Sequence, residues 1–176
     1  MSGARNTRQA CGISLSIERS LRIKVSRAPK SSSHFPLKGR LLDPQAFTAP
    51  PRLFQALLGR SKPVRIDEQD TLFNQGDLPR GLFLLVVGEV TLQMRSDEGE
   101  SIMYFRAGPG SVLGLPAVVS QSPYTLSAIV HKGSEMRFVD REEFDEVLRE
   151  TPSLYPLVLD LLASEVRAAR QAAFGL

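Results

Sequence analysis

The organisation of this chain is clearest in Gly108–Ala128, which reads Gly-Pro-Gly-Ser-Val-Leu-Gly-Leu-Pro-Ala-Val-Val-Ser-Gln-Ser-Pro-Tyr-Thr-Leu-Ser-Ala. The stretch is rich in Gly, Pro and Ser, and alternating apolar segments flank it on both sides. A loop of this composition has no core of its own, so a surrounding scaffold must set its shape. Gly114 followed by Pro116 also predicts the start of a short helix. A helix entered through glycine presents free backbone N–H groups, which can bind an anion.

The flanking segments predict a series of short β-strands, because apolar and polar residues alternate in them and turn residues separate them. The predicted strands are residues 64–66, 71–73, 82–95, 101–106, 124–131 and 135–139. Gly88 interrupts the longest strand, as a bulge or a tight corner would. Residues 96–100 form a predicted hairpin turn.

Three segments have helical periodicity. They are residues 42–60, with Pro50 and Pro51 near the start, residues 141–150, and residues 153–172. The order of elements predicts a mainly β fold with helices: an antiparallel β-roll or jelly roll (a double-stranded β-helix) capped by an N-terminal helix and two C-terminal helices. We assign residues 41–152 to the roll and residues 153–176 to a C-terminal helix.

The long C-terminal helix carries a wide apolar stripe, which one domain can bury only in part. The surplus predicts a partner helix and hence a homodimer formed through residues 153–172. The residues assigned to this dimer helix are Leu157, Leu161, Leu162, Val166 and Ala169.

Charge divides the chain into two unequal parts. Residues 1–40 contain nine Lys or Arg and one acid, whereas the remaining residues contain 13 basic and 18 acidic groups. We interpret residues 1–40 as a basic, disordered arm; an extra strand and an arm that binds acidic surfaces are the alternatives. The acidic remainder is a poor electrostatic match for nucleic acid.

Composition argues against an enzyme and against a metal site. His34 and His131 are far apart, Cys11 is the single cysteine, and the serines lack the setting of a nucleophile. No run of apolar residues is long enough to span a membrane. We therefore expect no catalytic residue, no metal, no membrane association and a cytoplasmic location.

Four pieces in the right order resemble the cyclic nucleotide-binding domain, as found in the catabolite-activator (CRP/FNR-like) family. They are residues 71–77, residues 81–90, residues 110–114, and the helical segment from residue 141 onward. The resemblance covers about residues 42–172, and it implies a β-roll that binds a cyclic nucleotide and signals through a dimerising helix.

The chain departs from the family pattern at both charged positions of the phosphate-binding cassette. The family has Glu after the glycine and Arg before a Ser-Ala or Thr-Ala pair; here these positions hold Leu115 and Leu126, and Pro116 is also unusual. The resemblance assigns ligand binding to two short segments. Their residues are Gly114, Leu115, Pro116, Ala117, Thr125, Leu126, Ser127 and Ala128.

These departures favour a non-catalytic regulatory or sensor module whose nucleotide specificity is altered or lost and which signals through its C-terminal helix. Two alternatives stay open: a ligand-free dimerising adaptor that binds a protein partner, and a cyclic-nucleotide regulator that uses substitute basic residues such as Arg80, Arg106 or Lys132. No cofactor is expected beyond a cyclic nucleotide or another small ligand. Only residues 173–176 follow the last helix, so we expect no sequence-specific DNA binding by this chain.

Overall fold

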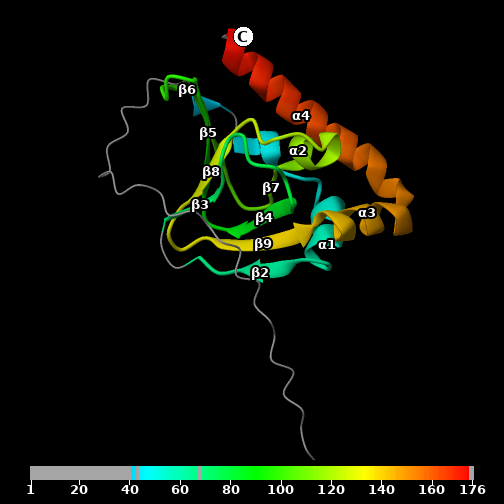
Figure 1. Ribbon diagram of the computed structural model, residues 1–176. Helices are drawn as coiled ribbons and strands as arrows, with labels where there is room; N and C mark the ends of the chain where they lie inside the picture. The colour runs from blue at the N-terminus through cyan, green and yellow to red at the C-terminus, as the bar shows by residue number, and fades with distance from the viewer. Residues whose placement is uncertain (1–40, 43, 67–68, 175–176) are drawn as a thin grey trace, which may run out of the picture.

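A computed structural model describes residues 41–42, 44–66 and 69–174 of the chain. Residues 1–40, for which the sequence predicts a basic arm, lie outside the described residues. The described part forms a two-sheet β-roll with helices packed along one side (Figure 1).

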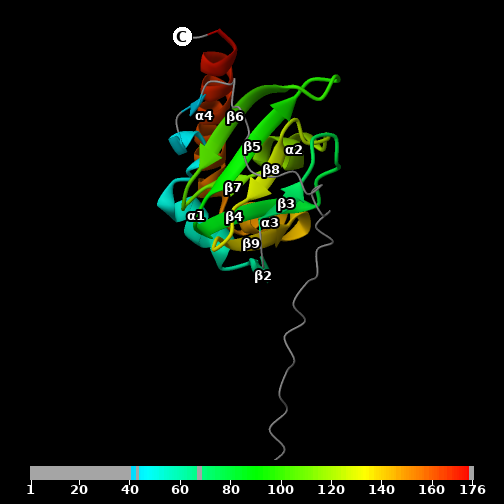
Figure 2. The ribbon, with the colours of Figure 1, turned by 90° about the vertical axis from the view of Figure 1, so that its left-hand side faces the viewer.

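One sheet has five strands in the order β1-β6-β5-β8-β3, and the other has four strands in the order β2-β9-β4-β7 (Figure 2). All neighbouring strands are antiparallel except β1 and β6, which run parallel. The strands of the first sheet are β1 (Leu41–Leu42), β3 (Asp70–Phe73), β5 (Val90–Arg95), β6 (Ser101–Ala107) and β8 (Ser127–Val130). Those of the second are β2 (Lys62–Val64), β4 (Gly81–Val87), β7 (Val112–Leu113) and β9 (Glu135–Asp140). The predicted mainly β roll is confirmed.

Gly88 divides the segment predicted as one strand, residues 82–95, into two strands. Its φ is +96°, and a Cβ at this position would lie 2.2 Å from the Ser134 hydroxyl oxygen. Both facts require glycine. The chain turns a tight corner here, so β4 lies in the four-stranded sheet and β5 in the five-stranded sheet.

The helices are η1 (Pro44–Phe47) and η2 (Pro152–Leu154), both 3-10, and the α-helices α1 (Pro51–Leu58), α2 (Leu115–Ser120), α3 (Arg141–Glu150) and α4 (Tyr155–Phe174). The predicted bounds of α3 are confirmed. The helix predicted over residues 42–60 is confirmed over Pro51–Leu58, but its predicted start is wrong, and residues 44–47 form a separate 3-10 helix. Pro50 has an extended ψ of 137° because the residue before a proline is disfavoured in helical conformation, so α1 starts at Pro51. The predicted strand at 124–131 is likewise shorter, since β8 begins at Ser127.

Two apolar clusters fill the molecule, and α4 contacts both. The first lies inside the roll and includes Phe73, Phe105 and Ala168; the second lies between the roll and helices α1 and α3, and includes Val158 and Leu161. Helix α4 therefore runs along the whole side of the roll (Figure 1). Every helix of the described residues is too short or too polar to cross a membrane.

Candidate ligand-binding site

Helix α2 and the loop before it form the predicted cassette around Gly114. Gly114 caps α2 with a φ of +87°, and a Cβ there would lie 2.9 Å from Cε1 of Tyr124. Only glycine combines this backbone angle with this close approach. Pro116 occupies the first turn of α2 and has no amide hydrogen, so this turn offers one donor fewer than other residues would give.

The structure divides the three residues that follow Gly114 between two environments. Pro116 and Ala117 line a cavity, whereas Leu115 is 1% exposed and packs in the cluster between the roll and α1 and α3. Leu115, which the sequence analysis assigns to the position of the family's Glu, is thus a core side chain that faces away from the cavity.

The second predicted segment is divided in the same way. Thr125 and Leu126 line the cavity. The Ser127 hydroxyl accepts a hydrogen bond of 2.9 Å from the backbone N–H of Gln75, and Ala128 is fully buried in the roll interior. Ser127 thus holds the turn at residues 74–77, and both residues have structural contacts of their own.

Tyr124 forms one wall of the cavity and is also part of the core. Its ring stacks on Phe73 with 3.9 Å between ring centroids, and its hydroxyl donates to the Gly81 carbonyl at 3.3 Å. Burial, with a smaller effect of the nearby Asp77 carboxylate, raises the pKa of Tyr124 to about 12. The ring therefore stays neutral at any physiological pH.

The cavity has a volume of about 40 Å³ and lies between the cassette and helix α4. Its lining is apolar and aromatic apart from Thr125, the Tyr124 hydroxyl and one carboxyl group. The lining residues are Phe47, Phe73, Leu92, Gly114, Pro116, Ala117, Tyr124, Thr125, Leu126 and Glu165. None of the described residues in this lining is Lys or Arg.

Glu165 brings the carboxyl group into the cavity from α4. Its Oε1 atom is buried and has no hydrogen-bond partner among the described residues. Burial raises the pKa of Glu165 to about 8, because a charged carboxylate is poorly solvated there. The sequence analysis missed this residue. The apolar face of α4 that packs on the roll consists of Val158, Leu161, Ala168 and Ala172, and Glu165 interrupts it. This acidic residue within an apolar face was the sequence feature that could have indicated a buried carboxyl group.

The residues assigned to the dimer helix fall on two faces of α4. Leu161 is 2% exposed, and Leu157 and Leu162 are half-buried against the same protomer's core. Val166 is 49% exposed and Ala169 is exposed. Leu161 is therefore an internal core residue, which corrects its assignment to a partner contact.

Comparison with protein families matches residues 63–151 to the model named "Cyclic nucleotide-binding domain". The chain belongs to the cyclic nucleotide-binding domain family. The domain is a non-enzyme. This follows from its family and from two relatives, one named as a receptor and one as a regulator.

Two curated relatives and one solved structure are similar to this domain. The "Cyclic AMP receptor protein" of Thermus thermophilus is 28% identical over 98 residues, which cover 56% of this chain and 45% of the relative. The "CRP-like cAMP-activated global transcriptional regulator" of Mycobacterium tuberculosis is 23% identical over 117 residues, which cover 66% and 52%. The chain thus spans about half the length of the curated relatives it matches.

The crystal structure of the Thermus thermophilus catabolite activator protein superimposes with a TM-score of 0.58 and 24% identity, covering 76% of this chain and 61% of that protein. This likeness confirms the fold of the domain.

Proposed function

We propose that this domain is a regulatory sensor that binds a small ligand in the cavity and signals through α4. The observation that carries the proposal is that the cavity is closed on one side by the cassette and on the other by the α4 side chain Glu165. A ligand in this place contacts both the roll and the helix, so its binding energy depends on how α4 is seated.

Two properties of the cavity support altered or lost specificity for cyclic nucleotides. The described lining of the cavity holds no Lys or Arg that could pair with a phosphate. Losing one partner of a buried charge pair costs about 2–5 kcal/mol, and each 1.4 kcal/mol lowers the affinity about tenfold. The volume of about 40 Å³ holds about three water-sized groups, so most of a nucleotide would have to lie outside this space.

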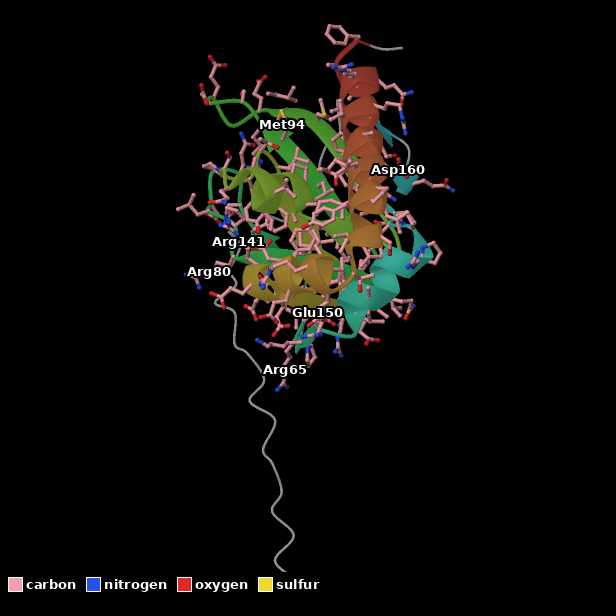
Figure 3. The ribbon with its side chains drawn as sticks, turned by 90° about the vertical axis from the view of Figure 1, so that its right-hand side faces the viewer. Arg65, Arg80, Met94, Arg141, Glu150 and Asp160 are labelled. Atoms are coloured by element: carbon pink, nitrogen blue, oxygen red, sulfur yellow. The ribbon has the colours of Figure 1, made fainter. Side chains whose placement is uncertain are left out.

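The basic residues considered as substitutes lie elsewhere. Arg106 forms an ion pair with Glu89 at 3.5 Å, with half of its side chain exposed. Arg80 is exposed and lies away from α4 (Figure 3). Lys132 follows β8 in the turn before β9 and is not in the cavity lining.

The homodimer that we propose uses the exposed apolar stripe of α4, next to the face that packs on the roll. Tyr155, Leu159 and Val166 are 48%, 64% and 49% exposed. Together with Leu162 and Ala169 they recur at alternating intervals of four and three residues, the spacing of a helix pair. The proposed dimer contact thus includes Tyr155 and Leu159, in place of Leu157 and Leu161 from the sequence analysis.

Isothermal calorimetry and thermal shift with cyclic AMP, cyclic GMP and cyclic di-GMP test the nucleotide specificity. We expect no saturable binding of cyclic AMP at micromolar concentration, because the cavity offers its phosphate no counter-charge. Cyclic AMP is the ligand named for the two relatives. Micromolar binding of cyclic AMP would contradict the proposed change of specificity and favour the alternative of a nucleotide regulator that uses other basic residues.

Substitution of Leu159 and Val166 by Asp tests the dimer. Sedimentation should show fewer dimers in this double variant and an unchanged distribution in Asp160→Asn, a control on the same helix (Figure 3). A wild-type dimer that binds no small molecule in any screen would favour the adaptor alternative. An unchanged dimer in the double variant would refute the proposed interface.

A further inference from the structure

Glu165 places in the cavity an acceptor oxygen to which no described group donates a hydrogen bond. The Oε1 atom is buried and without a hydrogen-bond partner among the described residues, and the other lining side chains are mostly hydrocarbon or aromatic. Leaving a buried polar atom unpaired is costly, and such atoms in folded proteins call for an explanation. A bound group that donates a hydrogen bond to Glu165 would provide the missing partner.

The charge of this group follows from the rest of the lining. An anion would meet no Lys or Arg among the described lining residues. A cation would form a charge-assisted hydrogen bond, which is stronger than a neutral one. Aromatic residues such as Phe47, Phe73 and Tyr124 surround the same space, and aromatic rings attract organic cations.

We propose that the cavity binds a small organic cation, an alkylammonium or amidinium group, with Glu165 as its counter-charge. The apolar part of the ligand lies against Leu92, Ala117 and Leu126, and its charged group meets the carboxyl group on α4. This inference rests on the proposed sensor function and specifies its ligand class.

The cavity geometry limits the size of the ligand and gives it an entrance. The volume of about 40 Å³ admits a ligand of a few heavy atoms. Pro116 and Thr125 line the cavity and are exposed to solvent, so a ligand can reach the cavity from their side. A ligand that enters there reaches Glu165 on α4.

Calorimetry with three probes of similar size and different charge tests this inference: propylammonium, 1-propanol and propionate. We expect propylammonium to bind wild-type protein at least about tenfold more tightly than propanol, and propionate to show no binding. Glu165→Gln should remove this preference, whereas Asp160→Asn on the exposed face of α4 should keep it. Asp160 is labelled in Figure 3.

Proton release gives a second readout that a purely structural role would not produce. Tyr124 is the other titratable group in the described cavity lining and stays neutral below its pKa of about 12. Because burial raises the pKa of Glu165 to about 8, the carboxyl group is protonated at pH 6.5 and becomes ionised when a cation binds. Titrations at pH 6.5 in phosphate and in maleate buffer, neither of which contains an organic cation, should therefore reveal release of up to about one proton in the wild type and none in Glu165→Gln.

The outcomes separate this inference from the sensor proposal. Propylammonium binding that Glu165→Gln leaves unchanged, or tighter binding of propionate, overturns the cation site. If the protein binds a cyclic nucleotide but does not bind propylammonium, the cation site is overturned and the sensor proposal stands. Amine binding that leaves the α4 amide NMR signals and the dimer fraction unchanged supports the cation site and overturns signalling through α4. Absence of binding by every probe overturns both.

Discussion

Replacing Glu165 by Gln should make the domain more stable at neutral pH, and the gain should grow with pH. The structure buries this carboxyl group in the cavity, and burial raises its pKa from 4.5 to about 8. In the unfolded chain the same group ionises near pH 4.5. Gln has nearly the same shape and cannot ionise, so the comparison isolates the cost of burying the acid.

The sign follows from the direction of the shift. Between about pH 4.5 and pH 8 the folded protein holds a proton on Glu165 that the unfolded chain has lost, so the free energy of unfolding falls as pH rises. The stabilising effect of protonation is complete below pH 4.5 and is gone above pH 8. A pKa that rises from 4.5 to about 8 corresponds to about 5 kcal/mol. We expect a measured difference of about 2–3 kcal/mol, because the protein relaxes and water enters around the ionised carboxylate.

Urea unfolding at half-unit steps from pH 4.5 to 8.5 measures this effect for the wild type and Glu165→Gln. Protein concentration is held constant, because a dimer makes stability depend on it. The difference between the two proteins cancels the titration of groups they share. Asp160→Asn is the matched control: its side chain is exposed on α4, so its curve should run parallel to the wild type.

Parallel curves for the wild type and Glu165→Gln across the whole range would refute the reasoning. They would mean that the Glu165 carboxyl is solvated in the folded state, and the cavity would then lack the buried acceptor on which the cation site depends. A Glu165→Gln variant that becomes less stable than the wild type as pH rises would refute it as well, because that result would indicate a favourably paired carboxylate.

Two further substitutions test the cassette. Leu115→Glu places an unpaired carboxylate in the cluster between the roll and α1 and α3, so it should cost about 3 kcal/mol or more of unfolding free energy, read from urea denaturation at pH 7. A loss below 1 kcal/mol would mean that this position faces solvent or the cavity. Gly114→Ala should cost about 2 kcal/mol by the same assay, because the φ of +87° strains Ala and the new methyl group lies 2.9 Å from the Tyr124 ring. A fully stable alanine variant would contradict this backbone geometry.

Periodicity was sufficient to predict the elements whose contacts are local. The helix at residues 141–150 was predicted with the bounds it has, because its buried side chains Phe144, Val147 and Leu148 recur at helical spacing. The helix predicted over residues 42–60 was found over Pro51–Leu58, and its predicted start was wrong. The pattern of apolar residues does not record the extended conformation that a proline imposes on the residue before it.

The sequence by itself determined the mainly β roll and its order of motifs, because these are properties of residue type and spacing. Only the tertiary structure decided that Leu115 faces the core and Leu126 the cavity, and that Glu165, far away in the sequence, lines the same cavity as Leu126. It also decided which side of α4 is covered by the roll, and so which stripe remains exposed for a partner. A pattern records which face of an element is apolar, but the surface that this face meets depends on packing between segments distant in the chain.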